Sequence, residues 1–551
     1  MTLTASLDGG GNLVIQDTTG AVNSLTLQLN VAADSVVITD ANGQFANSAI
    51  SGAARSNSNN TMTVPLTSIT GSSISIQADG GDDALTIDLT NGNFAKAITY
   101  DGGTQTTTDS LTVTGGGTFA TVTHTATSAS AGTIAITGNS TISYLGLEPV
   151  IDNLSATDRV FTFTGGAETI TLVDAAGANM TIDSTLSESI TFANPTNSLT
   201  INAGTGADTV TITSVDADGP FNASLTINGD AGDDTINLNA DINFAANKNL
   251  DVNLTNDASG GDLDQISVGT NANLIALGTG TLNLQASRNI VMTTGSSLVG
   301  VNGAITVAGN SNGAAAAVAG NFIGVDLDGA TLTTSGTGAI SVTGQGVDDA
   351  TSGSHFGIRM QNSARVESTA TGATAGTITL TGTGGTGTTL NEGVRLLTTS
   401  VITAVDGAIV LQGTGSAAAT TTTNRGILIN NSSTVSSTGT GANAATITMT
   451  GTGGAGTSSN FGIHLANSAL VTSVRGAIAL TGTTLATNTG GGVEGVVLSA
   501  GGKVTSTGTG ATAATITLTG TGGGDGSVAF QGLGIQLTGS GSAVTSVDGA
   551  I

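Results

Sequence analysis

The sequence predicts an all-β chain whose C-terminal half folds as a right-handed parallel β-helix, also called a β-solenoid. Three observations predict this fold: a repeated phrase of three short apolar runs, 83 glycines among 551 residues, and no proline after Pro220. At a typical usage of ~5%, roughly 16 prolines would be expected in residues 221–551. In a β-helix both edges of every strand bond to neighbouring coils, so proline, which lacks an N–H, is excluded.

The N-terminal half is acidic and duplicated, and we expect two β-rich repeat units, residues 1–145 and 146–275. Ser73–Ile87 aligns without gaps on Ser198–Ile212. Leu-Thr-Ile and Ile-Thr-Leu runs bounded by Gly, Asp and Asn predict several short strands in each unit. We expect these units to be β-helical or, alternatively, small β-sandwiches.

Turns rich in glycine and aspartate punctuate this acidic region. Gly229–Asn237 resembles the calcium-binding nonapeptide of RTX (repeats-in-toxin) proteins, with Gly232, Asp234 and Ile236 at its glycine, aspartate and apolar positions. Other turns match less of the pattern: Gly206/Asp208/Val210, Gly81/Asp83/Leu85, Asp109/Leu111 with Thr107 in place of glycine, and the looser Asp262/Asp264/Ile266.

The resemblance to RTX turns implies calcium as a cofactor at Asp83, Asp109, Asp208 and Asp234. Ca²⁺ takes about six to eight hard oxygens, which such turns offer as carbonyls and carboxylates. In the RTX family the nonapeptides stand in immediate tandem, whereas Asp83 and Asp109, like Asp208 and Asp234, lie 26 residues apart. That step suits one β-helical coil, so we expect the turns to stack along one edge. The alternative is that these turns only shape the chain and keep it soluble.

A unit with three apolar beats repeats through residues 276–551, and Gly462–Gly482 shows it clearly. Its beats are Ile463/Leu465, Leu470/Val471 and Ile478/Leu480, and the alternation in the first and third indicates strands with one buried face. Third-beat isoleucines recur in steps of 38, 31, 38, 31, 38 and 35 residues, at Ile340, Ile378, Ile409, Ile447, Ile478, Ile516 and Ile551. First beats recur as Ile358/Met360, Val394/Leu396, Ile427/Ile429, Ile463/Leu465, Val496/Leu498 and Ile535/Leu537. We therefore expect one coil per unit, stabilised by stacking on its neighbours.

The coils alternate between about 31 and 38 residues because the turn between the second and third beats is alternately tight and long. Variable loops are expected between the third beat of one coil and the first beat of the next. They are Thr381–Glu392, Gly413–Arg425, Gly451–Phe461, Gly482–Gly492 and Gly520–Gly532. Loops on a rigid scaffold are where binding normally resides.

Composition argues against an enzyme. A β-helical polysaccharide lyase or hydrolase, the leading enzymatic alternative, needs clustered carboxylates, or a base with calcium, in a groove lined by aromatics. The chain has no Trp and two Tyr, and Asp348-Asp349 is the one adjacent acidic pair after residue 300. No G-x-S-x-G motif has supporting context, and the glycine-rich turns lack the Lys-Ser/Thr of a phosphate loop.

The three histidines, His124, His355 and His464, have no metal-binding spacing. His464 stands at the outward position of a first beat, where other coils carry varied residues, so we expect it to face solvent. Outward Thr-x-Thr pairs in Thr446–Thr450 and Thr515–Thr519 resemble those of ice-binding β-solenoids, but the pattern fails in alternate coils. Outward threonine also simply suits an exposed strand.

The Gly-Ala-Ile-x-Leu beats, the Thr/Ser/Gly/Ala composition and the absence of cysteine resemble the passenger regions of large bacterial surface adhesins of the filamentous-haemagglutinin and autotransporter type. The resemblance covers about residues 300–551 and rests on architecture. It implies a long, rigid, secreted stalk whose loops contact a host cell, a neighbouring cell, or an extracellular matrix or glycan. A purely structural sheath or matrix component is the alternative.

The resemblance also implies an extracellular location at a bacterial cell surface. A chain without cysteine fits a protein that crosses membranes unfolded, and no apolar stretch is long enough to span a membrane. The net charge of −27 opposes nucleic-acid binding. Met1–Asp8 lacks a signal-peptide pattern and Gly549–Ile551 falls within a beat, so we expect an internal piece of a longer protein.

Overall fold

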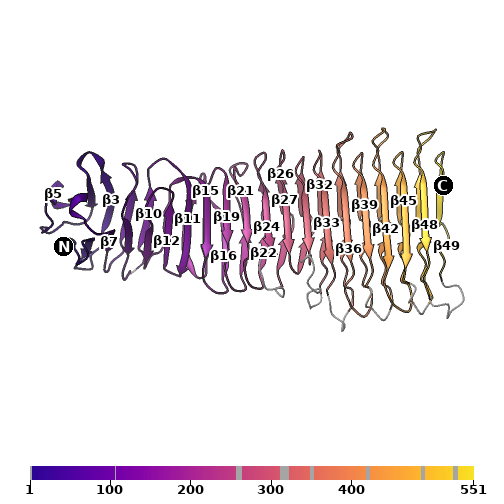
Figure 1. Ribbon diagram of the computed structural model, residues 1–551, viewed down its shortest axis with the longest axis horizontal. Helices are drawn as coiled ribbons and strands as arrows, with labels where there is room; N and C mark the ends of the chain where they lie inside the picture. The colour runs from indigo at the N-terminus through magenta and orange to yellow at the C-terminus, as the bar shows by residue number, and fades with distance from the viewer. Residues whose placement is uncertain are drawn as a thin grey trace. The chain divides into compact units, whose positions relative to one another are not determined.

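The computed structural model describes residues 3–105, 107–255, 263–310, 322–347, 353–416, 422–485, 491–524 and 532–551. The described chain is all-β, with long sheets rich in parallel strand pairs, as the sequence predicts (Figure 1). Its helical elements are three short 3₁₀ turns, η1 (Val31–Ala33), η2 (Asn57–Asn59) and η3 (Leu66–Ser68).

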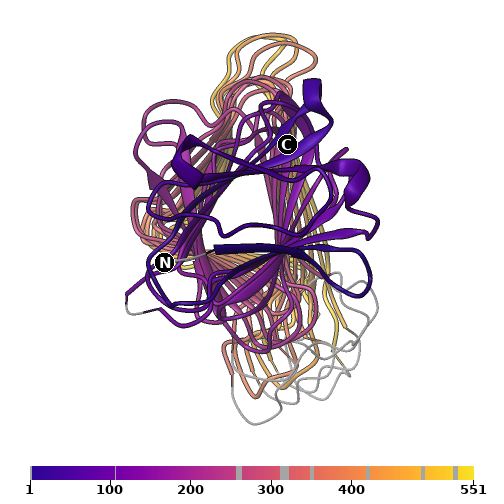
Figure 2. The same cartoon turned by 90° about the vertical axis from the view of Figure 1, so that its left-hand side faces the viewer.

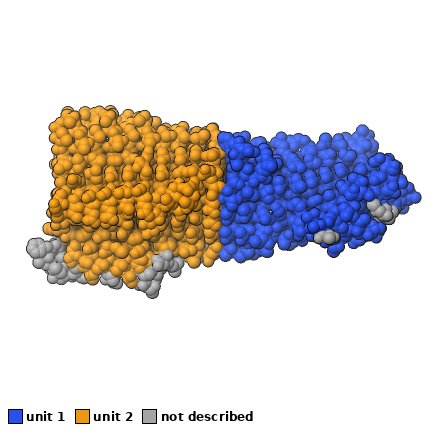
Figure 3. All heavy atoms as spheres, turned by 180° about the vertical axis from the view of Figure 1, so that it is seen from behind, with its two compact units in different colours: residues 1–230 blue, residues 231–551 orange. Residues whose placement is uncertain are grey.

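The chain divides into two compact units, unit 1 (Met1–Asp230) and unit 2 (Ala231–Ile551), which Figure 3 colours separately. The boundaries expected after residues 145 and 275 stay predictions. All four prolines fall in unit 1.

Unit 2 is built from three parallel sheets, and each turn of the chain adds one strand to each sheet. We call them the first, second and third sheets, after the three beats of the repeat. The first sheet comprises β22 (Thr235–Leu238), β25 (Gln265–Val268), β28 (Asn289–Met292), β31 (Val325–Asp328), β34 (Ile358–Gln361), β37 (Val394–Leu396), β40 (Ile427–Ile429), β43 (Ile463–Leu465), β46 (Val496–Ser499) and β49 (Ile535–Thr538). The second sheet comprises β23 (Ile242–Asn243), β26 (Asn273–Ala276), β29 (Ser297–Gly300), β32 (Thr331–Thr334), β35 (Arg365–Ser368), β38 (Val401–Ala404), β41 (Thr434–Ser437), β44 (Leu470–Ser473), β47 (Lys503–Ser506) and β50 (Ala543–Ser546). The third sheet comprises β24 (Leu250–Leu254), β27 (Leu282–Ala286), β30 (Ile305–Gly309), β33 (Ile340–Gln345), β36 (Ile378–Thr383), β39 (Ile409–Thr414), β42 (Ile447–Gly453), β45 (Ile478–Thr484) and β48 (Ile516–Thr521).

The register of the third sheet confirms that one repeat stacks on the next. Ile340 pairs with Ile378, and the partners continue through Ile409, Ile447, Ile478 and Ile516 without a slip. The first beats pair in the same way, from Ile358 on Val394 to Val496 on Ile535. Register is strict here because a slip by one residue would turn every buried side chain outward.

The core of unit 2 consists of ladders of aliphatic side chains contributed by all three sheets. In β42, Ile447 and Met449 are fully buried, while Thr448 and Thr450, which alternate with them, are exposed. Figure 2 is a view along the direction in which the coils stack, and it shows the turns of unit 2 repeating at the same places from coil to coil. The alternation expected for strands with one buried face is therefore present.

Unit 1 consists of two sheets that mix parallel and antiparallel pairs. Sheet I contains β1 (Leu3–Leu7), β2 (Leu13–Asp17), β7 (Ser73–Gln77), β9 (Ala97–Asp101), β11 (Thr118–Ser128), β12 (Ala131–Ile136), β13 (Ile142–Leu145), β15 (Ser155–Phe163), β19 (Ser198–Asn202) and β21 (Ser224–Asn228). Sheet II contains β3 (Ser24–Asn30), β4 (Ser35–Asp40), β5 (Ala54–Ser56), β6 (Thr61–Pro65), β8 (Ala84–Asp88), β10 (Ser110–Thr114), β14 (Val150–Asp152), β16 (Thr169–Ala175), β17 (Asn179–Ser184), β18 (Ser187–Ala193) and β20 (Thr209–Ile212).

The parallel pairs of unit 1 join successive turns of the chain, as in β7 on β9 and β8 on β10. Antiparallel hairpins are inserted between these turns, as in β11–β12–β13 and β16–β17–β18. The duplication seen in the sequence is also structural. In both copies a strand, an acidic turn and a second strand follow one another, as β7–β8 and as β19–β20.

Candidate functional site

The variable loops of unit 2 connect the third sheet to the first, as the repeat predicts. The loops begin two to three residues later than predicted, because the third-sheet strands are longer than expected: β36 ends at Thr383, and β42 at Gly453. Gly-Thr pairs look like turn sequence, but they continue the ladder because Gly382 and Gly413 are register partners. Parts of three loops, residues 417–421, 486–490 and 525–531, lie outside the described residues.

Two glycines close the base of each loop. A Cβ on Gly382 would lie 2.1 Å from the carbonyl oxygen of Gly393, and a Cβ on Gly413 would lie 2.1 Å from that of Gly426. The same close approach recurs between Gly451 and Gly462, Gly482 and Gly495, and Gly520 and Gly534. These contacts are tighter than any side chain allows, so each loop leaves and re-enters the coil through a glycine pinch.

A charged cluster lies beside the first two pinches. The carboxylate of Glu392 is fully buried and accepts hydrogen bonds from Nη1 of Arg395, at 2.9 Å, and Nη1 of Arg425, at 2.7 Å. Each guanidinium also lies over an aromatic ring, Arg395 over Phe356 and Arg425 over Phe461, at 4.6 and 5.6 Å from the ring centres. Such paired and stacked arginines hold neighbouring loop bases together.

The four aspartates singled out as calcium ligands all precede a strand and are all buried. In three cases Oδ1 accepts a backbone N–H from another turn of unit 1. Asp83 accepts from Asn23 at 2.6 Å, Asp109 from Asp83 at 2.7 Å, and Asp208 from Glu168 at 2.8 Å. The expected stacking of Asp83 on Asp109 at a 26-residue step is therefore present. In unit 2 the backbone N–H of Asp234 donates to Oδ1 of Asp264 at 2.8 Å.

Burial raises the pKa of three of these carboxylates. It raises the pKa of Asp83 to about 6, against the hydrogen bond from Asn23, and the nearby Asp109 adds to the rise. Burial also raises the pKa of Asp109 and that of Asp208. The cause is the cost of holding a charge away from water.

Three of the four aspartates are committed to backbone hydrogen bonds in this structure. One oxygen of each of Asp83, Asp109 and Asp208 is already bonded to a backbone N–H, and the side chains are almost inaccessible. Within the described ranges, no three His, Asp or Glu side chains are grouped closely enough to hold a metal ion. Calcium binding at Asp83, Asp109, Asp208 and Asp234 stays a prediction of the sequence.

The histidines take up structural positions. His355 is fully buried, and His124 lies in the core of unit 1. His464 keeps the outward position expected of it in β43 (Ile463–Leu465) but is only partly exposed: Nε2 lies 2.8 Å from Oγ of Ser499, and the ring stands edge-on to Phe461. Burial, with Arg425 adding, lowers the pKa of His464 to about 3.

Unit 1 contains a buried ionic cluster that the sequence does not predict. Asp152 accepts hydrogen bonds from Nε2 of His124, at 2.8 Å, and from the guanidinium of Arg159, and all three side chains are at most 1% exposed. Burial would raise the pKa of Asp152, but the bond from His124 and the charge of Arg159 outweigh it and hold the pKa at about 2. His124 lies 28 residues before Asp152 and Arg159 lies 7 residues after it, so no periodic spacing in the sequence predicts the cluster.

A second missed feature is an uncharged face on the third sheet. The outward side chains of β33, β36, β39, β42, β45 and β48 are Ser341, Thr343, Gln345, Thr379, Thr381, Thr383, Val410, Gln412, Thr414, Thr448, Thr450, Thr452, Ala479, Thr481, Thr483, Thr517, Thr519 and Thr521. The threonine pattern fails in alternate coils in the column of Thr379, as expected. It continues in the column of Thr383, whose residues were expected to lie in loops.

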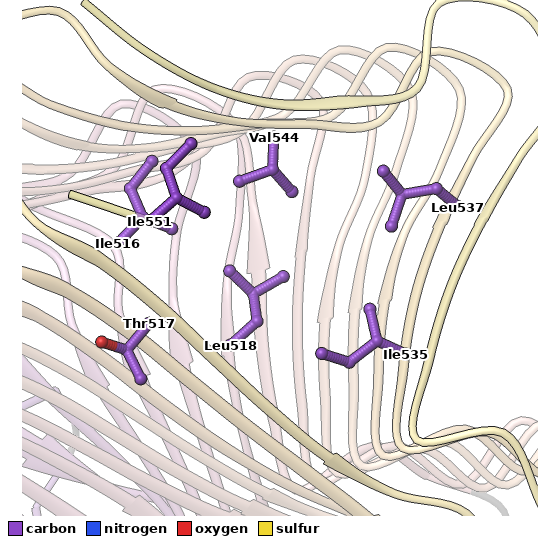
Figure 4. Close-up of a pocket in the computed structure, with 7 residues that line it drawn as sticks. All are labelled: Ile516, Thr517, Leu518, Ile535, Leu537, Val544 and Ile551. Atoms are coloured by element: carbon purple, nitrogen blue, oxygen red, sulfur yellow. The ribbon is translucent and has the colours of Figure 1, made fainter. Parts of the chain in front are cut away.

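At the last strands of unit 2 the apolar core is open. A cavity of about 340 Å³ is lined by Ile516, Thr517, Leu518, Ile535, Leu537, Val544 and Ile551 (Figure 4). Leu537 is 49% exposed, whereas its register partner Leu498 is fully buried. The comparison shows that a stacked coil is what buries each ladder residue.

Comparisons with known proteins do not suggest a function, so the proposal for this chain depends on its own structure. No protein-family model, no curated protein and no solved structure matches the chain. Among the described residues, no helix has the length and apolar character needed to cross a membrane.

Proposed function

We propose that this chain is a non-enzymatic extracellular repeat scaffold, part of a large bacterial cell-surface adhesin, whose loops attach to a cell, a matrix or a glycan. In this proposal the three sheets of unit 2 wind as a right-handed parallel β-helix closed around the aliphatic ladders. The location outside the cell and the identity of the ligand belong to the proposal.

The glycine pinch is the observation that carries this proposal. Between the two pinch glycines lie 10 to 13 residues, and these residues differ from loop to loop while the strands around them repeat. Every strand between the ends of the stack is hydrogen-bonded on both sides, so the loop bases sit on a rigid support. Variable loops on an invariant scaffold are the usual arrangement of a recognition surface.

The test measures attachment of purified residues 1–551 to cells, matrix proteins and a glycan array. Two fully described loop tips, Thr386–Leu390 and Ala455–Ser459, are replaced by Gly-Ser sequence of equal length. The matched control replaces Thr440–Asn443, in a long turn between the second and third sheets. Circular dichroism and the melting temperature confirm that each variant is folded.

The proposal predicts that the loop variants lose attachment while the control keeps it. If no surface is bound, or if all variants attach equally, the proposal is wrong. Self-association alone would favour the alternative, a structural sheath or matrix component. Cleavage of a polysaccharide by the purified chain would favour the enzymatic alternative.

A further inference from the structure

Two glutamates of unit 2, Glu392 and Glu494, occupy the same place in two different coils. Each is followed by a pinch glycine and then by the first residue of a first-sheet strand, Val394 and Val496. The column of residues before these glycines is continuous in space, because each glycine N–H bonds to the carbonyl of the column residue in the next coil. Its members are Phe356, Glu392, Arg425, Phe461, Glu494 and Leu533.

In the preceding coil, each of the two glutamates has a phenylalanine as its neighbour in the column. Phe356 precedes Glu392 in the column, and Phe461 precedes Glu494. Glu392, Phe356 and Arg395 form a first trio of contacting side chains. Arg395 bonds to Glu392 and lies over the ring of Phe356. The trio is an arginine site built from a buried carboxylate and an aromatic ring.

The second trio lacks its arginine, although the ring of Phe461 is already in contact with Arg425 from the preceding coil and with His464. The residue that corresponds to Arg395 is Val497, and the one that corresponds to Arg425 is Leu533. Glu494 is nevertheless 4% exposed, and its Oε2 has no hydrogen-bond partner among the described residues. A buried carboxylate oxygen without a donor is costly, and the cost is normally removed by a partner.

We propose that Glu494 and Phe461 form a binding site for a guanidinium group, the arginine side chain of a partner protein or peptide. Two hydrogen bonds to the carboxylate and contact with the aromatic ring would reproduce what Arg395 and Arg425 give Glu392 within the chain. Leu533, 39% exposed, borders the approach from the next coil. The site goes beyond the proposed attachment function and does not depend on what the loop tips bind.

The probe is Nα-acetyl-L-arginine methylamide, compared with the citrulline analogue, which keeps the shape but carries no charge. Binding to residues 1–551 is followed at pH 7.5 by isothermal titration calorimetry and by the NMR signals of the Val496 and Val497 methyl groups. The arginine probe is expected to bind saturably and at least about tenfold more tightly than the citrulline probe.

Glu494→Gln is expected to weaken arginine binding by about tenfold or more, whereas Glu367→Gln, at a partly exposed glutamate paired with Arg365, leaves it unchanged. Val497→Arg supplies the missing group from within the chain, so it is expected to raise the melting temperature and to abolish probe binding.

Equal binding of the two probes, or unchanged binding by a folded Glu494→Gln protein, would overturn the proposal. So would a Val497→Arg variant that melts no higher than the wild type and still binds the arginine probe. If the attachment test fails but the arginine probe binds as expected, the proposed function is wrong and the arginine site is still supported.

Discussion

The backbone N–H of Asp83 donates a hydrogen bond of 2.7 Å to Oδ1 of Asp109, one turn of the chain later. Unit 2 makes the same kind of bond with amides: the N–H of Asn424 donates to Oδ1 of Asn460 at 3.0 Å. In both cases a side-chain oxygen at the entrance of a first-sheet or sheet II strand holds the turn stacked on it. The acidic turns are thus coil-to-coil clamps in this structure, whatever else they bind.

Asp109→Asn is expected to stabilise the protein at neutral pH. Asparagine keeps the acceptor for the N–H of Asp83 but removes a buried charge whose Oδ2 has no hydrogen-bond partner in the described part of the chain. We expect a gain on the order of 1 kcal/mol in the free energy of unfolding at pH 7.5, measured by urea denaturation. Asp218→Asn, at an exposed position, is the control and should change little. A loss of stability in the Asp109 variant would contradict the view that the buried charge is costly.

The same variant tests the calcium prediction. If calcium binds the acidic turns, 5 mM CaCl₂ raises the melting temperature of the wild type relative to EDTA, and Asp109→Asn reduces that rise. If these aspartates act only through the hydrogen bonds seen here, the melting temperature is indifferent to calcium in both proteins. Asp208→Ala with Asp234→Ala extends the test to the second repeat.

Asp83 is expected to make the stability of the protein depend on pH. Burial raises its pKa to about 6 from an ordinary value of 3.8, so the folded state binds more protons between these pH values. Its contribution to stability is therefore fully present below about pH 4 and is lost as pH rises through 6. Urea midpoints from pH 4.5 to 7.5 should fall less steeply in Asp83→Asn than in the wild type. Parallel curves would mean that Asp83 does not titrate in this range.

The ionic cluster in unit 1 predicts a much larger effect. Asp152→Asn leaves the guanidinium of Arg159 buried without its counter-charge, which should cost about 3–5 kcal/mol of the free energy of unfolding. Glu367→Gln, which breaks the exposed pair with Arg365, should cost under about 1 kcal/mol. Equal losses in the two variants, measured by urea denaturation, would show that Arg159 is not held as the structure has it.

The glycine pinch predicts a sharp contrast between two glycines of similar sequence context. Gly413→Ala places a Cβ 2.1 Å from the carbonyl oxygen of Gly426 and should cost about 2–3 kcal/mol or more. Gly441→Ala, where a Cβ meets nothing within 4 Å, should be neutral or slightly stabilising. A tolerated Gly413→Ala, judged by melting temperature, would mean that the loop base is open.

The sequence predicts the three-strand repeat well because burial acts on a regular pattern. Ile378, Ile409 and Ile447 are register partners, as their spacing indicates, and the alternation of coil lengths follows from one long turn. Strand ends are less predictable, since the Gly-Thr pairs that continue the third sheet also resemble loops. Partners such as His124 and Asp152 carry no periodic signal. Burial of the aspartates was also missed, because a Gly-Asp turn looks exposed until the next coil covers it.

The fold depends on one relationship, the stacking of each coil on the next in strict register. The chain has no cysteine, so a disulfide placed between register partners tests it directly. Thr448 and Ala479 are partners on the outward face of the third sheet, and Thr517 is the next in the same column. Adjacent strands lie about 4.8 Å apart, within disulfide reach, whereas two coils span roughly twice that distance. Strict register predicts rapid oxidation of Thr448→Cys/Ala479→Cys, seen as a faster-migrating species in non-reducing electrophoresis, and none in Thr448→Cys/Thr517→Cys. Equal oxidation of both pairs, or of neither, would contradict it.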